Sequence, residues 1–322
     1  MIEVKHLTKR YGNHTAVSNL SFHIEKGQIY GFLGPNGAGK STTMNIMTGC
    51  LAATAGEVKV GGYDIFEEAE KAKKLIGYLP ELPPLYLDRT PREYLRFVAE
   101  AKGVPAKKVP EQLDYVMSVT QIQNVADRMI KNLSKGYKQR VGIAQALLGD
   151  PEVIILDEPT VGLDPAQIIE IRELIKELGK EHTVILSSHI LSEVQAVCQT
   201  VMIISKGKLV ACDTPDNLEK LFAGADTVNL ITEATEEEAR DILKDIPDVQ
   251  VMDVTASENG NLSLQLRVPQ SDDNGPCREL FFAFARRERA ILQMSTVRAS
   301  LEDIFIELTA GDKAAAKKEE NK

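Results

Sequence analysis

The sequence predicts an α/β fold with an inserted all-helical stretch, followed by a small α+β domain. Strand and helix patterns alternate on both sides of the insertion, which is typical of an α/β core. The apolar run over residues 153–156 has no polar interruption, as expected for a parallel strand covered on both faces. Past about residue 223 the predicted order is β-α-β-β-α-β, which is that of a ferredoxin-like unit.

The elements of the first part follow from local patterns. Alternating or continuous apolar residues predict strands over residues 2–7, 16–24, 28–33, 56–62, 74–79, 152–156, 183–186 and 201–204. Helical patterns lie over residues 42–48, 110–120, 137–148, 168–178 and 191–198. The helical insertion spans about 88–149, and near its start Thr90 is a capping residue before Pro91. The Pro-rich stretch 80–84 predicts a loop.

The second part has its own set of elements. Strands are expected over residues 227–231, 249–255, 262–268 and 290–294, and helices over residues 235–245, 276–287 and 300–308. The Lys- and Glu-rich end, residues 311–322, predicts a disordered, solvated tail. We therefore expect domains over residues 1–222 and 223–310.

Composition limits the classes of function. A formal net charge of −9 argues against a general nucleic-acid binder, so no nucleic-acid partner is expected. The four cysteines are far apart and form no Cys-x-x-Cys pair, which predicts free, buried thiols in a reducing compartment. No secretion signal is visible, and the apolar runs are far shorter than the ~18 residues of a membrane span. A cytoplasmic chain is expected.

The stretch from Gly34 to Thr42 fits the phosphate-binding pattern Gly-x-x-x-x-Gly-Lys-[Ser/Thr]. Glycines let successive backbone N–H groups turn inward, and the following helix adds its N-terminal partial positive charge. Lys40 would reach the β- and γ-phosphates, and the Ser41 hydroxyl would bind Mg²⁺. The alternative is a Gly-rich turn without a ligand, but an apolar strand before it and a helix after it are in the order that the motif needs.

Acidic and basic groups follow the later strands. Asp157 ends the apolar strand and is suited to hold Mg²⁺, while Glu158 can polarise water as a general base. The alternative role for this pair is a helix cap. His189 follows the next predicted strand and could hydrogen-bond a γ-phosphate, although a lone histidine is more often structural. Ser134 and Gly136 lie where a helix begins and offer a second anion site.

Together these segments, over about residues 1–222, resemble the ATP-binding cassette (ABC) ATPases. The correspondence runs in the family's order through Tyr11 as the adenine-stacking aromatic, residues 34–42 as Walker A, Glu81 as the Q-loop position, residues 133–137 as the signature motif, residues 153–158 as Walker B, residues 162–165 as the D-loop and His189 as the switch histidine. The resemblance implies a P-loop ABC ATPase core that binds ATP and Mg²⁺.

The residues that the resemblance assigns to nucleotide are Tyr11, Gly34, Asn36, Gly37, Gly39, Lys40, Ser41, Thr42, Glu81, Asp157, Ser134, Gly136 and Asp164. Ser41, Asp157 and Glu81 would hold the metal, and Glu158 and His189 would act in hydrolysis. The family pairs two cassettes head to tail, so Ser134 and Gly136 would act on the other subunit's nucleotide and Asp164 would couple the two sites. A homodimer is expected.

Two departures from the family pattern point to a subgroup. Lys135 and Tyr137 replace the first Gly and the Gln of the signature, and Glu81 stands where Gln is common. These residues resemble the ATPases of ABC-2 type exporters, including those associated with gliding motility. That resemblance implies a multi-span membrane permease as partner and a peripheral position on the inner face of the cell membrane. Residues 80–86 are our expected contact with the permease, the alternative being ordinary loop packing.

Two other classes of ATPase fit the sequence less well than a transport subunit. A soluble ABC protein acting on ribosomes or nucleic acid would usually carry two cassettes or a long coiled-coil insertion, and residues 40–134 are too short for such an insertion. A P-loop kinase would not explain the signature motif or Asp164.

Overall fold

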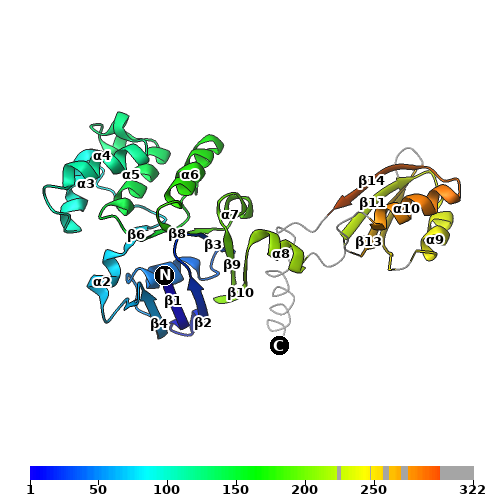
Figure 1. Cartoon of the computed structure of the whole chain (residues 1–322), viewed down its shortest axis with the longest axis horizontal. Coiled ribbons are helices and arrows are strands. Elements are labelled where there is room, and N and C mark those ends of the chain that lie inside the picture. The colour runs from blue at the N-terminus through cyan, green and yellow to red at the C-terminus, as the bar shows by residue number, and fades with distance from the viewer. Residues whose placement is uncertain (223–225, 247, 257–260, 270–274, 298–322) are drawn as a thin grey trace. The chain divides into compact units, whose positions relative to one another are not determined.

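The computed structural model describes residues 1–222, 226–246, 248–256, 261–269 and 275–297 (Figure 1). The chain forms two compact units, the first built from Met1–Pro215 and the second from Asp216–Ala310. Helix α8 (Pro215–Phe222) begins at this division, and the boundary expected at residue 222 lies at the end of the same helix. The expected helix 300–308 and tail 311–322 lie outside the described residues.

An antiparallel sheet lies near the N-terminus of the first unit. Its strands, in the order β2-β1-β4-β5, are β2 (His14–Ile24), β1 (Ile2–Tyr11), β4 (Ala55–Val60) and β5 (Tyr63–Asp64). Buried apolar residues on β1, including Ile2 and Val4, alternate with more exposed ones. One face of the sheet therefore belongs to the core.

The second sheet of this unit carries predicted site residues in the loops that follow its strands. Its order is β10-β9-β3-β8-β7-β6, and all neighbours are parallel except β10 and β9. The strands are β10 (Lys208–Asp213), β9 (Thr200–Ser205), β3 (Ile29–Leu33), β8 (Thr183–Ser188), β7 (Val153–Leu156) and β6 (Ile76–Leu79). Every residue of β3, β7 and β8 is buried, as in parallel strands covered on both faces. The loops after these three strands leave the sheet at the same edge.

The two sheets share a core with helix α1 (Lys40–Met47). Leu7 of β1, Phe32 of β3, Met44 of α1 and Ile155 of β7 are all part of this buried cluster. Burial on this scale, at about 25 cal/mol per Å² of apolar surface, fixes α1 against the sheet. The loop before α1 is therefore held between two rigid elements.

The helical insertion is confirmed as a group of packed helices. Its helices are α3 (Pro91–Ala101), α4 (Val109–Val119) and α5 (Lys135–Leu147), and the 3₁₀ turns Gln123–Val125 and Ile130–Asn132 lie between α4 and α5. The predicted cap at Thr90 is present: its side chain accepts from the Glu93 N–H, and the Glu93 side chain accepts from the Thr90 N–H. Two further helices follow sheet strands, α6 (Pro165–Leu178) after β7 and α7 (Leu191–Val197) after β8.

The second unit has the predicted ferredoxin-like order. It contains β11 (Asp226–Thr232), α9 (Glu236–Lys244), β12 (Gln250–Ala256), β13 (Leu262–Val268), α10 (Gly275–Arg286) and β14 (Ile291–Val297). The strands pair antiparallel in the order β12-β13-β11-β14. Leu230, Leu266 and Phe284 lie in a core of its own between the sheet and the two helices.

The sequence did not predict the short helix α2 (Ala69–Lys74), strand β5, the edge strand β10, helix α8 or the two 3₁₀ turns. The expectation of buried thiols is wrong for Cys50 and Cys212, which are exposed. Within the described ranges, no helix has both the length and the apolar composition needed to cross a bilayer.

Candidate active site

Two glycines in the loop between β3 and α1 have a positive φ. Gly39 has φ 104°, and a Cβ there would lie 2.5 Å from the Ala16 carbonyl oxygen. Gly37 also has a positive φ, 79°. The left-handed backbone and the close approach of β2 explain these residues, and they turn the loop so that α1 begins at Lys40. The N-terminal end of α1 therefore faces the site with its partial positive charge.

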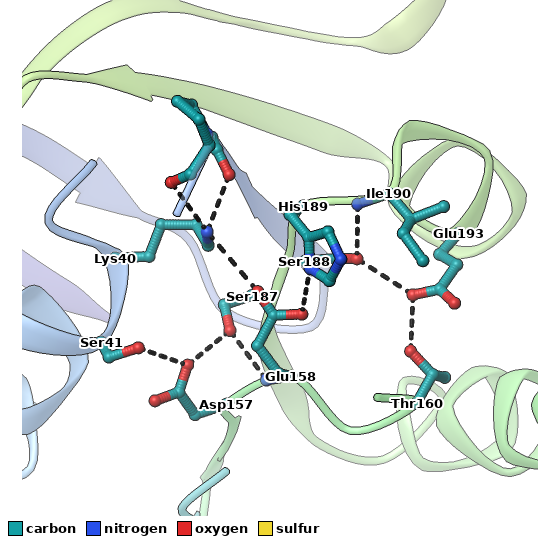
Figure 2. A network of polar contacts seen from close by, with 12 residues as sticks. Lys40, Ser41, Asp157, Glu158, Thr160, Ser187, Ser188, His189, Ile190 and Glu193 are labelled. Carbon is teal, nitrogen blue, oxygen red and sulfur yellow. Dashed lines mark hydrogen bonds and ion pairs between the residues drawn. The ribbon is translucent and has the colours of Figure 1, made fainter. Parts of the chain in front are cut away.

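The Lys40 side chain is held in one position. It is only 5% exposed, and its Nζ donates to the carbonyl oxygens of Gly34, at 2.7 Å, and Pro35, at 3.3 Å. The same Nζ lies 3.5 Å from Glu158 Oε1 (Figure 2). A buried ammonium with these contacts is a fixed positive charge beside the loop, as phosphate binding requires.

Asp157 and Ser41 come together although they are far apart in the sequence. Asp157 follows β7, and its Oδ1 accepts from Ser41 Oγ at 3.1 Å and from Ser187 Oγ at 2.6 Å (Figure 2). Ser187 Oγ in turn accepts from the backbone N–H of Glu158 at 2.8 Å. Sequence reasoning placed Asp157 and Ser41 here but missed Ser187, which is fully buried at the end of β8.

Glu158 and His189 form a direct pair. Parallel pairing of β7 and β8 brings the ends of the two strands side by side, and Glu158 Oε2 lies 2.9 Å from His189 Nδ1 (Figure 2). The Glu158 backbone has φ 50°, in the left-handed region that non-glycine residues avoid. Such strain at a functional position, held by the Ser187 hydrogen bond, aims the carboxylate at the histidine and the lysine.

A cleft of about 460 Å³ joins most of the predicted site residues. It is lined by Tyr11, His14, Ala16, Asn36, Gly37, Ala38, Gly39, Lys40, Ser41, Thr42, Glu81, Glu158, Val161 and His189. The Tyr11 ring is half exposed, with Lys9 Nζ 5.1 Å from its centroid. His14, Ala16 and Val161 were not singled out from the sequence, because no motif marks them, and Ala38 occupies an unspecified position of the phosphate-binding pattern.

Five predicted residues lie outside this lining: Gly34, Asp157, Ser134, Gly136 and Asp164. Gly34 and Asp157 contact the lining residues Lys40 and Ser41. Ser134 caps α5, and its hydroxyl accepts from the Tyr137 N–H at 3.3 Å. Gly136 is buried, and a Cβ there would lie 2.7 Å from the Gln167 side chain. Asp164 caps α6 by accepting from the Gln167 N–H at 2.9 Å. The starts of α5 and α6 are thus in contact with one another, and neither Ser134 nor Asp164 lines the cleft of its own chain.

A second layer of polar groups supports the loop. Asn45 Nδ2 donates to the Ser41 carbonyl oxygen at 2.8 Å, and Tyr78 Oη donates to Asn45 Oδ1 at 3.3 Å. Burial, together with the nearby negative charge of Asp157, raises the pKa of Tyr78, so the phenol stays protonated and keeps donating. Neither residue was singled out from the sequence.

The donors near Asp157 fit a magnesium ion. In the described part of the chain, no three His, Cys, Asp or Glu side chains gather as a metal site. Magnesium bound with a nucleotide, however, needs only one or two protein oxygens besides phosphate and water. Two neighbouring ligands of an octahedral Mg²⁺ lie about 2.9 Å apart, close to the 3.1 Å between Ser41 Oγ and Asp157 Oδ1.

Comparisons with a family profile and with individual known proteins all match the chain to ABC transporter ATP-binding proteins. The profile of the ABC transporter family matches residues 17–161. The uncharacterized ABC transporter ATP-binding protein YhcH of Bacillus subtilis (strain 168) is 35% identical over 97% of this chain and 97% of its own length. The linearmycin resistance ATP-binding protein LnrL of the same organism is 32% identical over 96% of this chain and 98% of its own length.

A solved structure described as the ATP-binding subunit of an ABC transporter has the same fold in the first unit. It superposes with a TM-score of 0.63 at 31% sequence identity, covering 69% of this chain and 93% of the other.

Proposed function

The chain belongs to the ABC transporter ATP-binding proteins, and from that membership we propose that it is the ATPase subunit of an ABC-2 type exporter. It binds ATP and hydrolyses it, as its family does. The observation that carries the assignment of the active site is the meeting of Lys40, Glu158 and His189 in one cleft. A relative that confers linearmycin resistance matches both units of the chain, which supports export as the direction of transport.

The residues of the cleft account for hydrolysis. Lys40 and the N-terminal end of α1 bind the β- and γ-phosphates, and their fixed positive charge stabilises the charge that develops during phosphoryl transfer. The Glu158 carboxylate orients a water molecule and draws on its proton, while His189 contacts the γ-phosphate and keeps Glu158 in place. Tyr11 stacks on the adenine ring. Ser41 and Asp157, with Glu81, would hold Mg²⁺, which neutralises phosphate charge when bound.

A second subunit completes this site in our proposal. Ser134 and Gly136 begin α5, where the free N–H groups and the helix dipole attract an anion, but they do not line the chain's own cleft. A partner subunit could place the same groups over the nucleotide, with Asp164 beside them. We expect a homodimer, because this one chain carries the cleft residues and the signature residues.

As a transporter's ATP-binding subunit, the chain works with a membrane permease. Our proposal places the contact at residues 80–86, where Leu82 is 82% exposed, Tyr86 is also exposed, and the neighbouring Leu87 extends the exposed apolar surface. The Tyr86 ring packs against Tyr94 and Phe97 of α3, with centroids 5.5 and 5.4 Å apart. A cluster of exposed apolar side chains of this kind is typical of an interaction surface. The chain would then lie on the cytoplasmic face of the membrane through its permease.

Substitution of Glu158 tests the active site. Glu158→Gln should keep its affinity for ATP, lose hydrolysis by about 10²-fold or more, and accumulate as an ATP-bound dimer in size-exclusion chromatography. Glu152→Gln is the matched control, because Glu152 precedes the same strand and pairs with Lys26 on the surface. Hydrolysis by Glu158→Gln at the unmodified rate would remove Glu158 as the base.

Co-purification tests the permease contact. A tagged chain extracted from membranes should bring a multi-span protein with it, and Leu82→Ser with Tyr86→Ser should release that protein. Tyr63→Ser is the control, since Tyr63 is exposed on the antiparallel sheet. The alternative of a soluble ATPase acting on ribosomes or nucleic acid gains no support from the relatives, and co-purification of ribosomes in place of a membrane protein would favour it.

A further inference from the structure

Glu193 is a buried carboxylate that the proposed hydrolysis does not use. It lies within α7 and is only 4% exposed. One of its oxygens, Oε2, accepts two hydrogen bonds, from Thr160 Oγ1 at 2.5 Å and from Ser188 Oγ at 3.0 Å (Figure 2). Neither donor carries a charge. Glu193 is therefore a buried acid held by hydroxyl groups.

The part of the chain that the structure describes holds no ion pair that includes Glu193. Burying an acid without a positive partner is costly, and a glutamate in this position would be a poor choice if it only filled space. The carboxylate at position 193 instead serves as one acceptor for the hydroxyl groups of both Thr160 and Ser188.

The two hydroxyl donors come from the backbone segments that carry Glu158 and His189. Thr160 follows Glu158 by two residues, and Ser188 directly precedes His189. Ser188 Oγ also accepts from the backbone N–H of Ile190 at 3.0 Å, so this hydroxyl holds the chain on both sides of His189. Oε2 of Glu193 thus joins the loop after β7 to the loop after β8.

The helix that carries Glu193 is fixed against the sheet. A Cβ on Gly31 of β3 would lie 2.4 Å from Val194 Cγ1 and 2.9 Å from Cys198 Sγ, so α7 lies as close to β3 as a glycine allows. Val194 is fully buried. Because the residue next to Glu193 cannot move relative to the sheet, the carboxylate is a fixed point for both loops.

We propose that Glu193 is a positioning residue for ATP hydrolysis, which holds Glu158 and His189 at their 2.9 Å separation by tying Thr160 to Ser188. The inference rests on the roles proposed above for Glu158 and His189. Glu193 does not line the cleft, so its proposed effect acts through the geometry of that pair. A displacement of about 1 Å in a catalytic group can reduce a rate by about 10²-fold.

Steady-state kinetics of the full-length chain give the first test. Glu193→Ala should lower kcat by about 10- to 100-fold and leave KM for ATP nearly unchanged, because Lys40 and Ser41 lie on other elements. Glu193→Gln should keep most of the activity, since a single amide oxygen can accept both hydrogen bonds. Thr160→Val should lose activity and Thr160→Ser should keep it, because only serine retains the hydroxyl.

A spectroscopic readout separates positioning from general stability. The chain has five histidines, so selectively labelled imidazoles give few NMR signals. His189, next to Glu158, should change its signal in Glu193→Ala. His182 is the internal reference, because it is buried just before β8 and its Nδ1 contacts the Pro151 carbonyl oxygen at 2.7 Å. Its signal should stay in place.

The outcomes distinguish this inference from the site assignment. His189→Ala and Glu158→Gln test the assignment, and full hydrolysis by both would overturn it together with the inference. If those two variants are inactive while Glu193→Ala keeps both its kcat and the His189 signal, only the role of Glu193 is refuted. A loss of activity in Glu193→Ala with the His189 signal unmoved, or a movement of both histidine signals, would also refute positioning. If Glu193→Gln does not hydrolyse ATP, the claim that one oxygen atom at this position suffices as acceptor for both hydroxyl groups would be refuted.

Discussion

Removal of the Ser187 hydroxyl should damage both stability and hydrolysis. Ser187 is fully buried, and its Oγ donates to Asp157 Oδ1 at 2.6 Å while accepting from the Glu158 N–H at 2.8 Å. Ser187→Ala leaves one oxygen of a buried carboxylate with one fewer donor and leaves the Glu158 N–H without this acceptor. A hydrogen bond to a charged group contributes about 1.5–3 kcal/mol, and an orphaned buried N–H costs about 1–3 kcal/mol.

These two contributions share one atom and do not simply add, so we expect a loss of about 2–4 kcal/mol in the free energy of unfolding. The hydrogen bond from the Glu158 N–H to Ser187 Oγ also holds the Glu158 backbone at φ 50°, a conformation that costs about 1–2 kcal/mol. Without it the Glu158 backbone should relax toward negative φ and turn its carboxylate away from His189. Hydrolysis should fall by about 10-fold or more.

Urea unfolding followed by circular dichroism measures the stability, and phosphate release measures hydrolysis. The second unit has its own core and does not contain the substitution, so its transition serves as an internal reference. Thr183→Val is the matched control at the other end of β8, where Thr183 Oγ1 accepts from the Gly27 N–H at 3.0 Å. It should cost about 1 kcal/mol and leave hydrolysis unchanged. Equal effects of the two variants on hydrolysis would refute the reasoning.

Three further outcomes follow from the structure. Lys40→Ala should lose most of its ATP affinity in equilibrium binding, whereas Lys26→Ala, which alters a surface pair, should not; equal affinities would contradict the loop assignment. A chain ending at residue 222 should still fold and bind ATP because, among the described residues, the core cluster shared by the two sheets and α1 contains none from the second unit, and a chain that fails to fold would place the boundary elsewhere. Cys198 should resist iodoacetamide at pH 8 until the chain is unfolded, because burial raises the pKa of its thiol. The exposed Cys50 should react under the same conditions. Labelling of Cys198 in the folded chain, detected by mass spectrometry, would show that α7 opens away from the sheet.

Much of the fold could be predicted because its signals are local. The loop glycines, the apolar run of β7 and the cap at Thr90 each depend on neighbours in the chain, and each element was found within a few residues of its place. Helix α2 was missed because six residues with three lysines carry no apolar period. Strand β10 was missed because it lies at an edge, where its antiparallel pairing with β9 is decided by tertiary contacts.

The residues of the candidate site also fall into two groups, those that a local sequence pattern predicted and those that it did not. Lys40 and Glu158 were found because each belongs to a spacing pattern, and the adjacency of β7 and β8 then brought His189 beside Glu158. Ser187 and Glu193 belong to no such pattern. Their importance arises from partners about 30 residues away in the sequence, and no local rule gives those contacts.

The two serines at the end of β8 explain how a strand end can be both buried and polar. Ser187 and Ser188 were expected to follow the strand, yet they are its last two residues and neither is exposed. Side chains alternate along a strand, so the two hydroxyls leave it on opposite faces. Ser187 reaches Asp157 and the Glu158 N–H, and Ser188 reaches Glu193. An apolar residue in either place would leave a buried carboxylate with one donor fewer, so the two hydroxyls help to bury acidic groups on both sides of one strand.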